Sequence, residues 1–221
     1  MQPITARSQK MRESSLPQDV LGCALGAAIG INAVFTYSFA TAWRRRGAPF
    51  VPSARSKVNA IFHSEHGLLR SVGSRRSAMH LVDLGSGSGS IVRAAVREGG
   101  FGRATGIELN PALVAYSRLL SLGQGEHERF ELKNMWLADL ADADVVFVYG
   151  VPSIMPELSK KLREELRVGT LVVSNGFEVA GLGPAEEAVW VDAGLKRGSL
   201  DDSSRVYLYR IQIQGGSLGK S

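Results

Sequence analysis

The chain has 221 residues, with 44% hydrophobic and 21% charged side chains, which is the balance of a globular protein with room for one domain and a sizeable core. Its single cysteine excludes an internal disulfide framework and a cysteine-based zinc site, and its four histidines show no metal-ligand spacing. The net charge of +5 is compatible with nucleic acid, an anionic membrane surface or an acidic protein partner, and it selects none of them.

An uncharged, apolar run occupies residues 20–43, VLGCALGAAIGINAVFTYSFATAW, between Asp19 and three consecutive arginines. About 20 helical residues cross the ~30 Å hydrocarbon core of a bilayer, so this run predicts one membrane-spanning helix. Tyr37 and Trp43 lie toward its arginine end, where aromatic rings favour the membrane interface. A buried helix and a segment removed by cleavage are the alternatives for the same run.

Basic residues are distributed unequally on the two sides of this run. They are Arg7, Lys10 and Arg12 before it, and Arg44, Arg45, Arg46, Arg55 and Lys57 after it. Because basic residues concentrate on the cytoplasmic side of a span, the excess predicts that the rest of the chain faces the cytoplasm or the mitochondrial matrix. Residues 1–18 have several serines and few acids, which is compatible with a mitochondrial address.

Residues 44–77 connect this run to the rest of the chain. The prolines at positions 49 and 52 predict an extended stretch, and Ser53 can cap a helix that we expect to continue to about Leu69. Residues 71–77, SVGSRRS, are polar and predict a loop.

From residue 78 onward, short apolar runs alternate with helical patterns. Strands are expected at Met79–Leu84, Ala104–Ile107, Phe130–Leu132, Val145–Tyr149, Leu171–Ser174, Ala188–Val191 and Arg205–Ile213. Helices are expected at Ile91–Glu98, Pro111–Leu122 and Pro152–Leu166. This alternation indicates a doubly wound α/β domain with a mostly parallel sheet. The last strand follows another strand without a helix between them, so we expect it to run antiparallel.

A glycine-rich turn, LGSGSGS, follows the first expected strand. Ligands of doubly wound sheets bind at the carboxyl ends of the strands, near the switch in strand order. Gly85 and Gly87 allow the backbone to turn tightly and to approach a ligand without a Cβ in the way. A flexible linker has the same composition, but a linker is not normally clamped between a buried strand and an amphipathic helix. A dinucleotide site is the other alternative, and its third glycine would fall on Ser90.

The spacing GxGxG, with an acid two residues before the first glycine, is typical of a site for S-adenosylmethionine (SAM). The residues expected to contact the cofactor here are Asp83, Gly85, Ser86, Gly87, Ser88 and Gly89. At the end of the second strand, Glu108, followed by Leu109, can accept hydrogen bonds from both ribose hydroxyls, and a plain surface acid is the alternative. After the third strand, Asn134 can bind the adenine edge while Met135 or Trp136 packs on the ring, and a turn asparagine is the alternative.

Several further stretches match one known family. The most specific is ELNP at 108–111, followed by LV at 113–114 and YSR at 116–118. The others are Pro49-Phe50-Val51-Pro52, Val82-Asp83-Leu84-Gly85-Ser86-Gly87, Val151-Pro152-Ser153, the helix pattern LxxKLRxEL and Val172-Val173-Ser174. With the apolar run before them, these stretches resemble the membrane-anchored mitochondrial protein-lysine methyltransferases. Members of this family modify the c-subunit of ATP synthase and the adenine nucleotide translocase.

The resemblance implies a seven-strand SAM-dependent methyltransferase (Rossmann-like) domain behind one N-terminal transmembrane helix. It also implies that the substrate is a lysine of a mitochondrial inner-membrane protein and that the catalytic domain faces the matrix. Sharing one membrane plane would raise the effective concentration of enzyme and substrate. The chain departs from the family at Ser88 and Ser90, where the family has Asp and Arg, and at Asn134, where it has an acid. Residues 175–178, NGFE, replace an arginine-phenylalanine-proline run.

The expected organisation is a basic N-terminal segment at 1–19, an anchor at 20–43, a connecting segment and helix at 44–77, the methyltransferase domain at 78–214 and a tail at 215–221. Partial desolvation lowers the pKa of a lysine amine, ~10.4 when free, so we expect an apolar slot for it. Its expected lining is Phe50, Tyr149, Val151 and Pro152. No residue stands out as a general base, so no catalytic residue is assigned.

The alternatives are a methyltransferase for a small molecule, lipid or RNA, and a structural subunit of a membrane complex without activity. The sequence gives no strong case for nucleic acid.

Overall fold

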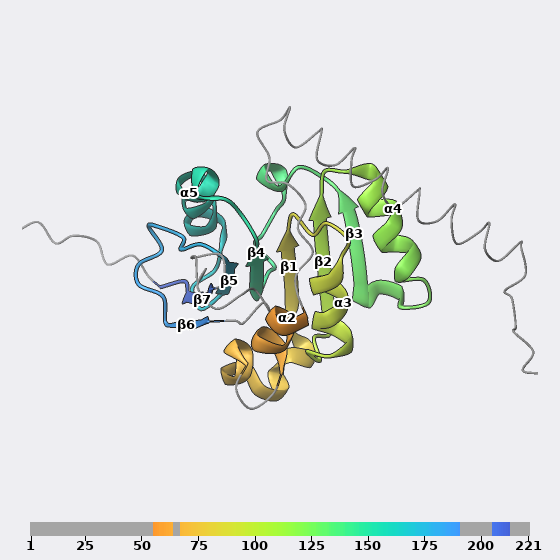
Figure 1. Ribbon diagram of the computed structural model, residues 1–221, viewed down its shortest axis with the longest axis horizontal. Coiled ribbons are helices and arrows are strands. Elements are labelled where there is room, and N and C mark those ends of the chain that lie inside the picture. The colour runs from red at the N-terminus through yellow and green to blue at the C-terminus, as the bar shows by residue number, and fades with distance from the viewer. Residues whose placement is uncertain (1–54, 64–66, 191–204, 213–221) are drawn as a thin grey trace, which may run out of the picture.

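The computed structural model describes residues 55–63, 67–190 and 205–212, so the predicted anchor at 20–43 lies outside the described residues. Seven strands form one sheet of order β3-β2-β1-β4-β5-β7-β6 (Figure 1). They are β1 (His80–Leu84), β2 (Arg103–Glu108), β3 (Glu128–Leu132), β4 (Val145–Val148), β5 (Leu171–Asn175), β6 (Glu187–Trp190) and β7 (Arg205–Arg210). Strands β1 to β5 are parallel, and β7 runs antiparallel to β5 and β6, which confirms the predicted antiparallel final strand.

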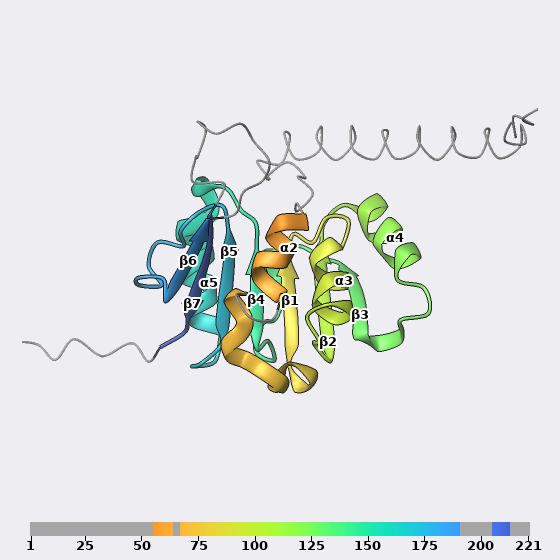
Figure 2. The same cartoon turned by 60° about the horizontal axis from the view of Figure 1, so that its bottom comes forward.

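Helices cover both faces of the sheet. The described helices are α2 (Arg55–Phe62), η1 (Leu68–Ala78), α3 (Ser90–Arg97), α4 (Pro111–Leu120), η2 (Gly125–His127), η3 (Met135–Leu137), η4 (Pro152–Ile154) and α5 (Met155–Glu165). Figure 2 shows α2 and α3 in front of the sheet and α5 behind it. Side chains alternate between the faces along each strand, so Val145 and Phe147 of β4 pack with α2, η1 and α3, whereas Val146 and Val148 pack with α5. Within the described ranges, no helix has both the length and the apolar character that a bilayer crossing requires.

The helix boundaries after residue 54 differ from those predicted. We expected one helix to about Leu69 and a loop at 71–77, but α2 ends at Phe62 and the loop residues belong to the η1 segment. The reason is tertiary, because Leu68, Leu69 and Val72 are buried in the core. The predicted helix at Pro152–Leu166 is also divided, into η4 and α5.

One side chain holds the η1 segment in place. The Arg76 guanidinium donates to the carbonyl oxygens of Phe62 and Gly99, both at 3.2 Å, and to that of Leu69 at 2.6 Å. The hydrogen bonds satisfy carbonyl groups at the ends of separate segments. This contact explains why a polar stretch adopts regular structure here.

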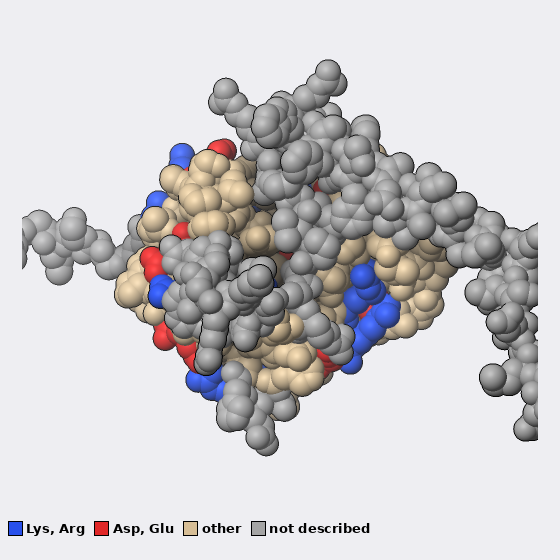
Figure 3. All heavy atoms as spheres, in the orientation of Figure 1, with Lys and Arg blue, Asp and Glu red and all other residues tan. Residues whose placement is uncertain are grey.

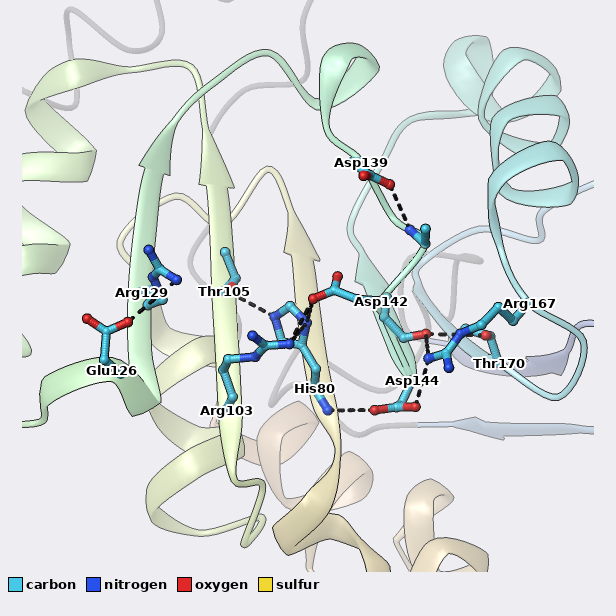
Figure 4. Close-up of polar contacts among 12 residues, drawn as sticks. His80, Arg103, Thr105, Glu126, Arg129, Asp139, Asp142, Asp144, Arg167 and Thr170 are labelled. Atoms are coloured by element: carbon cyan, nitrogen blue, oxygen red, sulfur yellow. Dashed lines mark hydrogen bonds and ion pairs between the residues drawn. The ribbon is translucent and has the colours of Figure 1, made fainter.

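Polar side chains join the amino ends of the strands, opposite the glycine-rich turn (Figure 4). The His80 ring bonds Thr105 Oγ1 at 2.8 Å through Nε2 and the Arg103 guanidinium at 3.0 Å through Nδ1. Arg103 also donates to Asp142 at 2.8 Å, and the His80 backbone N–H donates to Asp144 at 2.8 Å. Burial and the Arg103 charge lower the pKa of His80. This network holds β1, β2 and the segment before β4 in register. The same register sets the positions of the residues at the carboxyl ends of these strands, where the glycine-rich turn lies.

Candidate functional site

The turn between β1 and α3 has a backbone that only glycine adopts easily. Gly85, Gly87 and Gly89 have φ values of 82°, 53° and 73°. The N–H groups of Gly85 and Ser86 both donate to the Ile107 carbonyl oxygen, at 2.9 and 3.0 Å, which ties the turn to β2. A Cβ at Gly85 would meet no described atom within 4 Å, whereas one at Gly89 would lie 2.4 Å from the Phe130 ring. The turn is therefore packed on one side and open on the other.

Helix α4 supports this turn from below. The buried Ser117 hydroxyl donates to the Gly87 carbonyl oxygen at 3.2 Å. Its neighbour Arg118 donates to the Phe130 carbonyl oxygen through Nε at 3.1 Å and Nη2 at 2.6 Å. Asn110 begins α4 by accepting from the Ala112 N–H at 2.9 Å. Asn110, Ser117 and Arg118 thus have structural tasks, which sequence reasoning noted only as part of a resemblance.

Glu108 points toward the turn from the end of β2. Its Oε2 accepts from the Gly87 N–H at 2.9 Å, and its Oε1 accepts from the Asn110 N–H at 2.8 Å. A carboxylate has about four acceptor positions, so about two stay available for ribose hydroxyls. The side chain is half-buried rather than extended into solvent, which argues against a plain surface acid.

Asp83 lies beneath the turn and is 3% exposed. Burial, and next the neighbouring Glu108 charge, raise its pKa from 3.8 to about 8. At neutral pH the carboxyl group therefore holds a proton in much of the population. SAM carries positive charges on its sulfonium and amino groups, and such a charge nearby would favour the ionised carboxylate.

Two serines predicted to contact the cofactor make different contacts. The Ser86 side chain is buried against β2, where a Cβ at Gly106 would lie 2.5 Å from its hydroxyl oxygen. Ser88 accepts a hydrogen bond at its carbonyl oxygen from Arg93 Nη1 at 2.8 Å. The Ser86 side chain is therefore turned into the fold, whereas Ser88 is half-buried and its side chain is not engaged by this contact.

The predicted adenine-binding residues lie along the ends of β2 and β3. Leu109 is 46% exposed beside Glu108. The Asn134 side-chain oxygen accepts from the Trp136 N–H at 3.2 Å, so it caps η3 as a turn asparagine does. The NH2 group and the second acceptor position of Oδ1 stay available for adenine, so this contact fits both the adenine role and the alternative of a turn asparagine. Met135 packs against the core on the α5 face.

The arrangement fits an adenosyl donor. The turn is open where a Cβ would stand at Gly85, and Glu108 lies at the next strand end as an acceptor for a diol. When bound, SAM supplies an activated methyl group. The residues around the turn would bind and orient SAM, and the chemistry would fall to a nucleophile placed behind the methyl group.

The predicted substrate-binding residues at the end of β4 lie at the same edge. Leu84 pairs with Val148, so Tyr149 follows beside Gly85. Tyr149 is half-buried, with the Lys57 ammonium of α2 5.3 Å from its ring centre. Val151 is half-buried, and Pro152 is exposed at the start of η4. Phe50 lies outside the described residues.

Sequence reasoning missed two residues near this edge. The sequence pattern presents Lys57 only as a basic residue after the predicted anchor, and no local pattern predicts its approach to Tyr149. Asn175 was noted only as part of a family departure, although it ends a strand of otherwise apolar or small residues, which was the available signal. Its side-chain amide is 1% exposed.

Comparisons with known proteins agree with this geometry. The family model of the ANTKMT methyltransferase domain matches residues 83–186. The lysine N-methyltransferase of the ATP synthase c-subunit from Mus musculus is 36% identical over 177 residues, covering 79% of this chain and 67% of that protein. The adenine nucleotide translocase lysine N-methyltransferase of Mus musculus is 40% identical over 118 residues, covering 50% of this chain and 51% of that protein.

A solved structure has the same fold. An RNA methyltransferase from Salinibacter ruber in complex with S-adenosyl-L-homocysteine is 28% identical, with a TM-score of 0.60, and the match covers 76% of this chain and 97% of that one. The bound molecule is the product that remains when SAM has lost its methyl group, which supports SAM as the cofactor here. The chain thus belongs to the family of SAM-dependent protein-lysine N-methyltransferases that includes the enzymes for the ATP synthase c-subunit and the adenine nucleotide translocase.

Proposed function

We propose that this chain methylates a lysine of a mitochondrial inner-membrane protein of the type of the ATP synthase c-subunit. The observation that carries the proposal is the match to the mouse lysine N-methyltransferase of that c-subunit, which extends over 79% of the chain. The supporting geometry is the glycine-rich turn at 85–89, called the donor turn because it would hold the methyl donor. It lies beside the end of β4, where Tyr149 and Val151 are half-buried. Such an edge suits the long apolar stem of a lysine with its amine at the tip.

The reaction needs little from the protein beyond placement. The lone pair of the neutral lysine amine forms the new N–C bond, and the sulfur of SAM keeps the electron pair of the broken C–S bond. The extra proton on the methylated nitrogen leaves to water. Positioning alone can contribute ~7–11 kcal/mol, and partial desolvation beside Tyr149 and Val151 favours the neutral amine. No side chain is required here as a general base.

We propose further that the run at 20–43 anchors the domain to the inner membrane, with the domain in the matrix. Its length and lack of charge support a span, and the arginines after it support this orientation. Arg55, where α2 begins, lies 12 positions after Trp43. An extended chain of that length reaches at most about 40 Å, so the catalytic edge would stay close to the membrane surface.

RNA is the competing substrate class, because the Salinibacter ruber structure is named as an RNA methyltransferase. Basic side chains gather over α3 (Figure 3). The two arginines of α3 already bind within the fold, because Arg97 pairs with Glu128 at 2.6 Å and Arg93 donates to Ser88 at 2.8 Å. This engagement leaves them poorly suited to phosphate groups, so we favour the lysine substrate.

The substrate assignment predicts a specific labelling result. Purified protein with methyl-labelled SAM should label the ATP synthase c-subunit reconstituted in lipid vesicles, and the label should map to one lysine by mass spectrometry. Replacement of that lysine by arginine should abolish labelling, because arginine stays protonated and offers no lone pair. Total RNA and protein-free vesicles serve as controls. Label that enters only RNA or lipid would contradict the proposal.

The anchor predicts a difference between membrane-bound and soluble substrates. A chain beginning at residue 44 should leave the membrane fraction, and its rate on the c-subunit in vesicles should fall about 10²-fold through lost effective concentration. Its rate on a soluble lysine peptide should equal that of the 221-residue chain, which shows that the domain is intact. Equal rates on vesicles, or membrane retention without residues 1–43, would refute the anchor.

A further inference from the structure

The Asn175 amide is buried without hydrogen bonds. The residue is 1% exposed, and neither its Oδ1 nor its Nδ2 has a partner among the residues that the structure describes. A buried polar group without a partner destabilises the fold, so an apolar residue of the same size would stabilise the free protein better. Unlike the buried hydroxyl of Ser121, which also has no partner within the described part of the chain, this amide lies at a strand end beside the predicted substrate slot, where a bound substrate can supply the missing partner.

The sheet register places this amide beside the predicted substrate slot. Asn175 ends β5, and the preceding Ser174 pairs with Val148 of β4, so Asn175 lies beside Tyr149. Along β5, Leu171 and Val173 face the α2 side, as Tyr149 does, and alternation puts Asn175 on that same face.

The donor turn lies on the other side of Tyr149, beside the end of β1. Leu84 pairs with Val148 across β1 and β4, which places Gly85 next to Tyr149. Neighbouring strands are ~4.8 Å apart, so Asn175 and Gly85, two strands apart, are separated by roughly 10 Å across the sheet. The end of β4, between the two, is where an acceptor nitrogen would face the donor.

We propose that Asn175 is the residue that positions the acceptor amine, with its Oδ1 accepting one N–H of the substrate lysine. This inference rests on the proposed lysine substrate. The hydrogen bond fixes the orientation of the amine, so that its lone pair points toward the donated methyl group. An amide suits the task because it carries no negative charge that would stabilise the unreactive ammonium form.

The decisive variant is Asn175→Leu, which keeps the volume and removes both polar atoms. We expect an unfolding temperature equal to or above that of the wild type, because two unpaired buried groups disappear. SAM affinity should stay within about twofold, whereas kcat on a lysine peptide should fall about 10²-fold, the effect of losing a positioning contact. Ser121→Ala is the matched control, because Ser121 is another buried side chain whose hydroxyl has no partner among the described residues, and its kinetics should not change.

Asn175→Asp gives a second, independent readout. A carboxylate in this position favours the ammonium form of the bound substrate, so the rise of kcat with pH, which reports the enzyme–substrate complex, should move to higher pH. Undiminished kcat in Asn175→Leu, or a loss of SAM affinity in it, would overturn the inference. If that variant does not fold, an unshifted pH profile in Asn175→Asp would overturn it instead. A wild-type protein that fails to methylate lysine would contradict the proposed function itself, and the variants would then show no difference to explain.

Discussion

Replacing Glu108 with alanine should weaken SAM binding by about 100-fold or more in a protein that stays folded, since a hydrogen bond to a charged group contributes about 1.5–3 kcal/mol. Two ribose hydroxyls would lose their acceptor. The Gly87 and Asn110 N–H groups, which donate to Glu108 at 2.9 and 2.8 Å, would lose their acceptor as well. The turn would therefore also be less well ordered before SAM binds. Isothermal titration of SAM and of S-adenosylhomocysteine measures this loss, which should be equal for the two because they share the ribose.

Glu108→Gln separates the charge from the shape. In the wild type each carboxylate oxygen receives one backbone N–H, but an amide offers one oxygen and one NH2, so one N–H would face a donor. We expect an affinity between those of the wild type and the alanine variant. Glu131→Ala is the matched control, because Glu131 is a half-exposed acid on the neighbouring strand, in register with Ile107. Unchanged SAM affinity in Glu108→Ala, or an equal loss in Glu131→Ala, would remove the ribose assignment.

Local patterns were enough to predict the strands and the donor turn. Strands β1, β4 and β5 are buried along their whole length, and such strands appear in the sequence as short apolar runs between polar or glycine-rich stretches. The turn was predictable because its three glycines adopt positive φ, which is a property of the residue type. Glu108 followed from its place at the next strand end.

Features that depend on distant contacts were not predictable. The polar segment at 71–77 forms regular structure because Arg76 reaches the Phe62 and Gly99 carbonyl groups, a contact between residues far apart in the chain. The importance of Ser117 depends on the approach of α4 to Gly87. Burial of Asn175 without partners emerges only when β5 lies between β4 and β7. Sequence periodicity predicts which face of a helix or strand a residue occupies, but it does not predict which residues of other elements contact that face.

Asp83→Asn should raise the free energy of unfolding of the SAM-free protein at pH 8 by an amount on the order of a few kcal/mol, since each pKa unit corresponds to about 1.4 kcal/mol. The pKa of Asp83 is 3.8 without the fold and about 8 in the folded protein. Between pH 3.8 and about pH 8, folding is therefore coupled to the uptake of a proton. The contribution of the protonated acid to stability is complete below about pH 4 and is lost as the pH rises through about 8. The amide resembles the protonated acid and lacks this dependence.

Urea unfolding at pH 5 and pH 8 tests the sign. The wild type should lose stability relative to Asp83→Asn on going from pH 5 to pH 8. Asp139→Asn is the matched control, because Asp139 is exposed and its side chain only accepts the Ala141 N–H at 2.9 Å, which an asparagine can also do. Parallel pH profiles for the wild type and Asp83→Asn would show that the buried carboxyl group titrates normally.

The same carboxyl group should make SAM binding depend on pH. A cation bound at the turn lowers the pKa of Asp83, so binding releases a proton wherever the free protein still holds one, which is below about pH 8. SAM affinity should therefore rise with pH up to about 8 and then level off, and titrations in buffers of different ionisation enthalpy should show the released proton. S-adenosylhomocysteine lacks the sulfonium charge, so its binding should release less. Equal release by both compounds would mean that Asp83 responds to their shared amino group, and no release by either would mean that the cation binds out of its reach.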